Sequence, residues 1–264
     1  MWKVRAPDYC VSGSSDATVY LLHGTYGGKE YWQPLTKRLV DQGYRVVAWD
    51  APGYGLSPMD PDFSIVNAAD VCARLIATTG TRNNILLGHS MGGQIAMRVM
   101  QKIPGLLDAF IISASIGYLA NQTESQKANF YKLRDTDETD PEVVQRKNFD
   151  IVSGMMGPRS SGPDVELVKR VGAATPGPAV KAALHAVRAT TEEDAIGILS
   201  SIRVPSLFIA GEMDTVGHAP SVKKNADRVT GSQYEVLAGC GHYPWAESPE
   251  AFWKILHAFL ARVK

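Results

Sequence analysis

The sequence predicts an α/β protein with a mostly parallel central sheet flanked by helices, and three observations predict it. Short β-branched or apolar runs alternate with amphipathic stretches, as in sheets whose parallel strands are joined by helices. This alternation stops near Ser115 and resumes after about Thr190, which indicates an insertion. The chain has 264 residues, of which 45% are hydrophobic, and this is enough for a well-buried core.

The elements expected before the insertion alternate regularly. The expected strands are the β-branched or apolar runs Thr18–Leu22, Tyr44–Trp49, Asn84–Leu87 and Leu107–Ile112. The expected helices are Glu30–Asp41, which Gly43 stops, a helix capped by Ser64, and Met91–Gln101. After Ser64 the apolar residues recur at helical spacing, at Ile65, Ala69, Cys72 and Ile76. Each helix therefore separates two strands, as parallel pairing requires.

The same alternation is expected after the insertion. Val204–Ala210 and Gln233–Leu237 are predicted strands, with a helix near Ser221–Arg228 between them. The last helix has Ser248 as its cap and Pro249 in its first turn. Its apolar stripe faces the core and consists of Phe252, Ile255, Leu256, Phe259 and Leu260.

The segment 115–190 contains helical pattern but no convincing strand, and it carries a Gly/Pro-rich patch between Gly154 and Pro178. A loop of that length without secondary structure is improbable inside a compact domain. We therefore predict a helical cap at 115–190, inserted into a core formed by residues 1–114 and 191–264.

Charge and cysteine content predict a soluble protein of a reducing compartment, the cytoplasm. Twenty-seven basic and 27 acidic residues balance, which gives no electrostatic reason to expect nucleic acid or a membrane as partner. Cys10, Cys72 and Cys240 lie too far apart for a zinc site or a disulfide framework. The N-terminal residues lack the apolar stretch of a signal peptide, and no apolar run reaches the about 18 residues of a membrane span.

A candidate nucleophile follows one of the predicted strands. Gly88-His89-Ser90-Met91-Gly92 has the pattern G-x-S-x-G between a strand and a helix. In such a tight turn, side chains two positions before and after the serine collide, so glycine is needed there. The helix that follows points its N-terminal amides at the place where negative charge develops. The context favours a nucleophile elbow over a turn without chemistry.

A serine needs a base, and the base needs an orienting group. His242 lies in the loop between the last predicted strand and the last helix, and Asp214 lies just past the strand Val204–Ala210. Both positions, like Ser90, are at carboxyl ends of strands, where open α/β sheets place their sites. The order Ser, Asp, His is the one expected for this arrangement. These three residues are the predicted catalytic triad.

These motifs together resemble the α/β-hydrolase fold family over nearly everything outside the cap. The resemblance also includes His23-Gly24-Thr25 and the run from Asp50 to Ser57. It implies that Ser90 is the nucleophile, His242 the general base and Asp214 the orienting acid. It implies further that the backbone N–H groups of Thr25 and Met91 form the oxyanion hole. The sequence departs from the family in Thr215-Val216-Gly217-His218 and in a short stretch before His23.

Other polar residues near these motifs have simpler interpretations. Glu212 is an alternative acid that ranks below Asp214, because the family register places the acid at Asp214. His23 is interpreted as a structural residue, His89 as a structural or pocket-wall residue, and Cys240 as a small buried side chain. Side chains that could touch substrate are Tyr26, Trp245, His218, Phe130, Met155 and Met156. The three aromatic residues could equally be core, a surface loop is the simpler interpretation of His218, and the two methionines suit a pocket wall.

The predicted function is hydrolysis of a carboxylic ester or lactone of a small, partly apolar molecule through an acyl-enzyme, with no metal or other cofactor. The same triad also suits a C–C bond hydrolase or an amide hydrolase, because a fold does not determine a reaction. A ligand receptor that keeps a hydrolase pocket is a third alternative. The sequence does not predict an oligomeric state.

Overall fold

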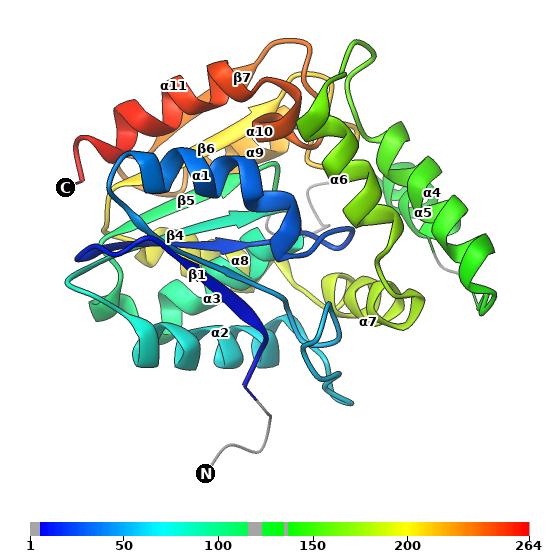
Figure 1. Ribbon diagram of the computed structural model, residues 1–264, viewed down its shortest axis with the longest axis horizontal. Helices are drawn as coiled ribbons and strands as arrows, with labels where there is room; N and C mark the ends of the chain where they lie inside the picture. Colours follow the sequence, from blue (N-terminus) through cyan, green and yellow to red (C-terminus); the bar gives the residue numbers. More distant parts are fainter. Residues whose placement is uncertain (1–5, 116–122, 135–136, 264) are drawn as a thin grey trace.

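The computed structural model describes residues 6–115, 123–134 and 137–263, and its centre is one seven-stranded sheet (Figure 1). The strands lie in the order β1-β3-β2-β4-β5-β6-β7, and all neighbours are parallel except β1 and β3. They are β1 Tyr9–Ser12, β2 Ala17–Leu22, β3 Arg45–Trp49, β4 Asn83–His89, β5 Ala109–Ser113, β6 Ser206–Gly211 and β7 Gln233–Leu237. The predicted α/β-hydrolase fold is confirmed.

Helices cover both faces of the sheet. One face packs against α2 Ile65–Thr79, α3 Met91–Lys102 and α9 Ala219–Ala226, and the other against α1 Gln33–Asp41 and α11 Pro249–Leu260 (Figure 1). Alternate residues of β2 serve the two layers, since Tyr20 packs in the first and Leu21 in the second. The sheet is thus buried on both sides, which explains why its central strands read as continuous apolar runs.

The strand that the sequence did not predict is β1. It has four residues at the sheet edge, three of them exposed, so it carries no apolar pattern. Its antiparallel pairing with β3 also brings Asp8 close to the next turn, where the Asp8 carbonyl accepts a hydrogen bond from Asp50 N–H. The predicted helix Glu30–Asp41 begins instead with a 3-10 turn, Lys29–Trp32, before α1.

Helices fill the described part of the chain between β5 and β6. They are α4 Glu124–Arg134, α5 Pro141–Gly154, α6 Pro163–Ala173, α7 Gly177–Arg188 and α8 Glu192–Ser201. Ala195, Ile198 and Leu199 of α8 belong to the core cluster under the sheet. The helices α4 to α7 lie together at one end of the sheet (Figure 1). The boundaries of core and cap stay a prediction.

Among the described residues, no helix has both the length and the apolar character that a bilayer crossing demands.

Candidate active site

Ser90 stands between β4 and α3 in a strained conformation. Its φ is 52° and its ψ −120°, a region that residues other than glycine rarely adopt. A Cβ atom on Gly88 would lie 2.4 Å from the Gly92 carbonyl oxygen, and a Cβ on Gly92 would lie 2.3 Å from that of Leu22. Both glycines are therefore required by the close backbone approach at this turn.

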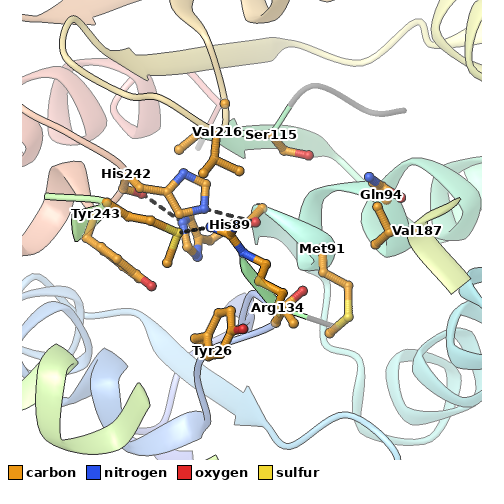
Figure 2. Close-up of a pocket in the computed structure, with 15 residues that line it drawn as sticks. Tyr26, His89, Met91, Gln94, Ser115, Arg134, Val187, Val216, His242 and Tyr243 are labelled. Atoms are coloured by element: carbon orange, nitrogen blue, oxygen red, sulfur yellow. Dashed lines mark hydrogen bonds between the residues drawn. The ribbon is translucent and has the colours of Figure 1, made fainter. Parts of the chain in front are cut away.

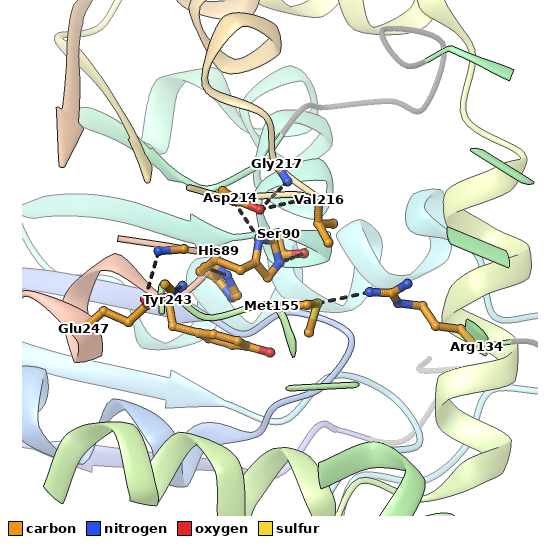
Figure 3. A network of polar contacts seen from close by, with 12 residues as sticks. His89, Ser90, Arg134, Met155, Asp214, Val216, Gly217, Tyr243 and Glu247 are labelled. Carbon is orange, nitrogen blue, oxygen red and sulfur yellow. Dashed lines mark hydrogen bonds and ion pairs between the residues drawn. The ribbon is translucent and has the colours of Figure 1, made fainter. Parts of the chain in front are cut away.

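The structure brings the three predicted triad residues into one hydrogen-bonded chain (Figure 3). His242 Nε2 lies 3.0 Å from Ser90 Oγ, and His242 Nδ1 lies 2.8 Å from Asp214 Oδ2. The Asp214 and His242 side chains are almost completely buried. With Nδ1–H donating to the carboxylate, Nε2 is free to accept the serine proton.

The carboxylate of Asp214 is itself held by backbone donors. Its Oδ1 accepts hydrogen bonds from Val216 N–H at 2.7 Å and Gly217 N–H at 2.8 Å. These donors belong to the segment in which the sequence departs from the family pattern, so the departure still supplies an orienting loop. Glu212, the alternative acid, is exposed and accepts a hydrogen bond from Gly239 N–H, whereas Asp214 is the partner of His242 Nδ1.

His23 organises the loop that carries Thr25. Its Nε2 accepts a hydrogen bond from Ala51 N–H at 2.9 Å, so Nδ1 carries the proton and donates to the Gly24 carbonyl at 2.8 Å. A Cβ on Gly24 would lie 2.9 Å from Ser90 Cβ, which shows how closely this loop passes the serine. Thr25 and Met91 both line the cavity in front of Ser90, and Met91 is the first residue of α3.

His89 links the serine turn to two neighbouring loops. Its Nε2–H donates to the His242 carbonyl at 2.9 Å, while its Nδ1 accepts from the Tyr31 hydroxyl at 3.0 Å. Tyr31 in turn accepts a hydrogen bond from Gly24 N–H at 2.8 Å. Burial, helped by the nearby His242, lowers the pKa of His89 well below its usual value. A neutral His89 therefore connects the Gly24 loop, the serine turn and the histidine loop.

Glu247 of α10 Pro244–Glu247 anchors the histidine loop. Its carboxylate accepts hydrogen bonds from both neighbours of His242 in sequence and from two residues that follow α5 (Figure 3). The donors are Gly241 N–H at 2.8 Å, Tyr243 N–H at 2.8 Å, Gly157 N–H at 2.7 Å and the Ser160 hydroxyl at 2.5 Å. The Met155 carbonyl also accepts from His242 N–H at 2.9 Å. Glu247 was not among the residues predicted from the sequence.

A cavity of about 40 Å³ opens in front of Ser90 (Figure 2). Two of the predicted substrate contacts, Tyr26 and Met155, line it. Burial raises the pKa of the Tyr26 hydroxyl to about 12. The wall also contains polar side chains that the sequence analysis missed, Arg134 and Gln94. Gln94 lies one helical turn after Ser90, a spacing that could have indicated it, whereas nothing local to Arg134 marks it.

The other predicted substrate contacts do not line this cavity in the described residues. Trp245 is buried behind it, with its ring centroid 4.4 Å from that of Trp32. His218 caps α9, and its carbonyl accepts from the helix's first turn. Met156 packs on the apolar core instead. The side chain of Phe130 lies outside the described part of the chain.

The sequence matches a known protein family over most of its length. A family model described as the alpha/beta hydrolase family matches residues 19–255. A pimeloyl-[acyl-carrier protein] methyl ester esterase of Pectobacterium carotovorum is 25% identical over 249 residues, which are 94% of this chain and 95% of that protein. A Variovorax paradoxus protein named as a carbamate hydrolase, RutD, is 30% identical over 107 residues, only 39% of this chain and 40% of that protein.

A solved structure shares the fold. The esterase EaEST of Exiguobacterium antarcticum superposes with a TM-score of 0.81, covering 96% of this chain and 94% of that one. The sequence identity over that superposition is 21%, so the likeness concerns the fold.

Proposed function

The chain belongs to the alpha/beta hydrolase family and is a hydrolase, and from this we propose that it cleaves a carboxylic ester or lactone through an acyl-enzyme on Ser90. The observation that carries the proposal is the hydrogen-bonded chain from Ser90 Oγ through His242 to Asp214. The esterase among the relatives that matches along nearly the whole chain favours ester chemistry. The substrate is then a small molecule.

The first half of the reaction forms the acyl-enzyme. Ser90 Oγ attacks the ester carbonyl carbon as His242 Nε2 takes the hydroxyl proton, and Asp214 stabilises the resulting imidazolium. The backbone N–H groups of Thr25 and Met91 donate to the oxyanion, and the α3 N-terminus adds its positive partial charge. The tetrahedral intermediate collapses when His242 donates the proton it took from Ser90 to the leaving alcohol oxygen.

The second half releases the acid. A water molecule gives a proton to His242 Nε2 and attacks the acyl carbonyl, forming a second tetrahedral intermediate at the same oxyanion donors. Collapse of this intermediate breaks the bond to Ser90 Oγ, which takes back the proton from His242. The balance is one ester and one water consumed, and one acid and one alcohol formed. In a lactone the leaving alcohol stays attached to the acid.

The test is covalent labelling together with turnover. A fluorophosphonate probe should label Ser90, and Ser90→Ala should abolish both labelling and hydrolysis of p-nitrophenyl acetate while circular dichroism stays unchanged. Labelling at another residue, or activity in Ser90→Ala near the wild-type level, would contradict the assignment of Ser90 as the nucleophile. The same assay separates an enzyme from a receptor, because a receptor binds without turning over the ester.

A further inference from the structure

A buried cation lines the cavity that contains the candidate nucleophile. Arg134 is the last residue of α4, and only 6% of its surface is exposed. Its side chain reaches toward the site, and a guanidinium N–H contacts the Met155 sulfur at 3.1 Å (Figure 3). This contact holds the guanidinium beside Met155, and both residues line the cavity in front of Ser90. The cap thus contributes a positive charge to the wall of the cavity.

The charge acts inside a small cavity. Burial lowers the pKa of the Arg134 guanidinium, yet arginine stays protonated at neutral pH. The Tyr26, Tyr243 and Asp214 side chains lie near enough for their negative forms to favour the charged guanidinium. Of these, Asp214 is already engaged with His242 and two backbone N–H groups. An anion that enters the cavity meets the guanidinium at a low local dielectric, where charge-assisted hydrogen bonds are strongest.

A second polar group points into the same space. The Tyr26 ring lines the cavity and the residue is 4% exposed, but its hydroxyl has no hydrogen-bond partner among the described residues. Arg134 lines the same cavity, and its charge opposes the effect of burial on the Tyr26 pKa. Figure 2 shows both side chains directed into the cavity. A buried hydroxyl without a partner in the protein is a donor available to a bound ligand.

We propose that the substrate carries a carboxylate, which the Arg134 guanidinium and the Tyr26 hydroxyl bind while Ser90 attacks the ester. Arginine suits this role because its planar fork matches the two oxygens of a carboxylate. The proposal deepens the ester-hydrolase function above and rests on it. The cavity of about 40 Å³ limits the number of atoms between the ester and the carboxylate, since one water already needs roughly 10–15 Å³ of such space. The carboxylate therefore stands only a few atoms from the ester.

The experiment compares charged esters with neutral esters of the same shape. On the acyl side, monomethyl succinate is paired with methyl 4-methylpentanoate, in which an isopropyl group replaces the carboxylate. On the alcohol side, O-acetylglycolate is paired with isobutyl acetate. Hydrolysis is followed in a pH-stat. We expect kcat/KM for the charged member to exceed that of its partner by about tenfold or more in one pair, and that pair tells which end Arg134 holds. A preference for the neutral member in both pairs overturns the proposal.

Variants then assign the preference to Arg134. In Arg134→Gln, the charged-to-neutral ratio of kcat/KM should fall about 10- to 100-fold, and Arg134→Lys should keep part of it. Tyr26→Phe should lower the ratio less, because it removes one neutral donor. Arg146→Gln on α5 is the matched control, since Arg146 is exposed outside this cavity, and its ratio should equal that of the wild type. A wild-type ratio in folded Arg134→Gln overturns the proposal.

Absence of the carboxylate site and absence of hydrolase activity would give different experimental results. If Arg134→Gln does not fold, Tyr26→Phe and the wild-type substrate pairs still decide the matter. An enzyme that is labelled at Ser90 and hydrolyses esters, but without preference for the charged members, overturns the carboxylate site and leaves the hydrolase proposal intact. Failure of the fluorophosphonate probe to label Ser90, together with no turnover of any ester, overturns both.

Discussion

At the scale of single residues, hydrogen bonds hold the Asp214 and His242 side chains in one orientation each. The Asp214 carboxylate accepts from His242 Nδ1–H with one oxygen and from two backbone N–H groups with the other. This arrangement determines the tautomer of His242, because only an acceptor faces Nδ1. The lone pair that is left on Nε2 points at Ser90 Oγ.

Asp214→Asn should therefore damage catalysis while keeping the shape of the site. An amide can turn its NH₂ toward His242, which then protonates on Nε2 and cannot accept the Ser90 proton. We expect kcat to fall by about 10⁴-fold, the size of loss seen when the acid of such a triad is amidated. The measurement is kcat for p-nitrophenyl acetate.

Glu212→Gln is the matched control for that experiment. Glu212 is exposed, two residues before Asp214, and bonds Gly239 N–H rather than His242. Its amidation should change kcat by less than about threefold, as surface substitutions generally do little. A greater loss in Glu212→Gln than in Asp214→Asn would mean that the acid has been assigned to the wrong residue.

At the scale of elements, loops from distant parts of the chain are held against one another. The histidine loop after β7 receives its geometry from α10 through Glu247, and the segment after α5 shares the same carboxylate. One side chain thus ties the segment after α5 to the histidine loop. The hydrogen bonds from Gly24 N–H through Tyr31 and His89 to the His242 carbonyl likewise tie the Gly24 loop to the histidine loop.

Glu247→Ala should lower activity even though Glu247 does not line the cavity. Gly241 and Tyr243 would lose the acceptor of their N–H groups, and His242 between them would shift. A displacement of about 1 Å in a catalytic group costs on the order of 100-fold, so we expect that loss in kcat. The rate of fluorophosphonate labelling at Ser90 should fall in parallel, since it needs the same base.

Glu250→Ala provides the comparison for Glu247→Ala. Glu250 lies three residues further on in α11 and pairs with Arg38 on the surface. Its removal should leave kcat within about twofold, because exposed ion pairs contribute little. Equal activity of the two variants would show that the carboxylate of Glu247 does not position His242.

Sequence patterns predicted these elements unevenly. Ser64 was expected to cap a helix, and its hydroxyl accepts from Asn67 N–H at 3.0 Å at the start of α2. Such a cap is local, so four residues are enough to reveal it. The edge strand β1 has mostly exposed residues and left no pattern. Trp245 was expected as a possible substrate contact or core residue, and its ring packs against Trp32.

At the scale of the whole molecule, two completely buried histidines couple stability to pH. Burial lowers the pKa of His23, against the opposing effect of the Asp50 carboxylate, and burial with the nearby His242 lowers that of His89. Both rings use one nitrogen as a hydrogen-bond acceptor, which only the neutral form provides. Below the unfolded-state value near 6.5, the unfolded chain therefore binds more protons than the folded one.

The free energy of unfolding should thus fall as the pH is lowered through 6.5, until the folded-state pKa values are reached. Each histidine contributes a slope of about 1.4 kcal/mol per pH unit in that window. Urea unfolding at several pH values between 7.5 and 5 measures the slope of the free energy of unfolding against pH. His89→Gln should be less stable at pH 7 but show about half the slope. An unfolding free energy that does not change between pH 7 and 5 would contradict this linkage.

The sequence by itself determined the α/β class, the helices and strands with strong periodicity, and the three residues that the structure joins in one hydrogen-bonded chain. These features depend on short segments of the sequence. They are the alternation of strand-like and helix-like hydrophobic patterns, the G-x-S-x-G turn, and the loops at strand ends. The tertiary structure alone decided which side chains surround Ser90. Arg134 at the end of α4 and Tyr26 after β2 come from segments far apart in the chain, and both line the cavity in front of Ser90. Side-chain neighbours of this kind depend on packing in three dimensions, which no local pattern records.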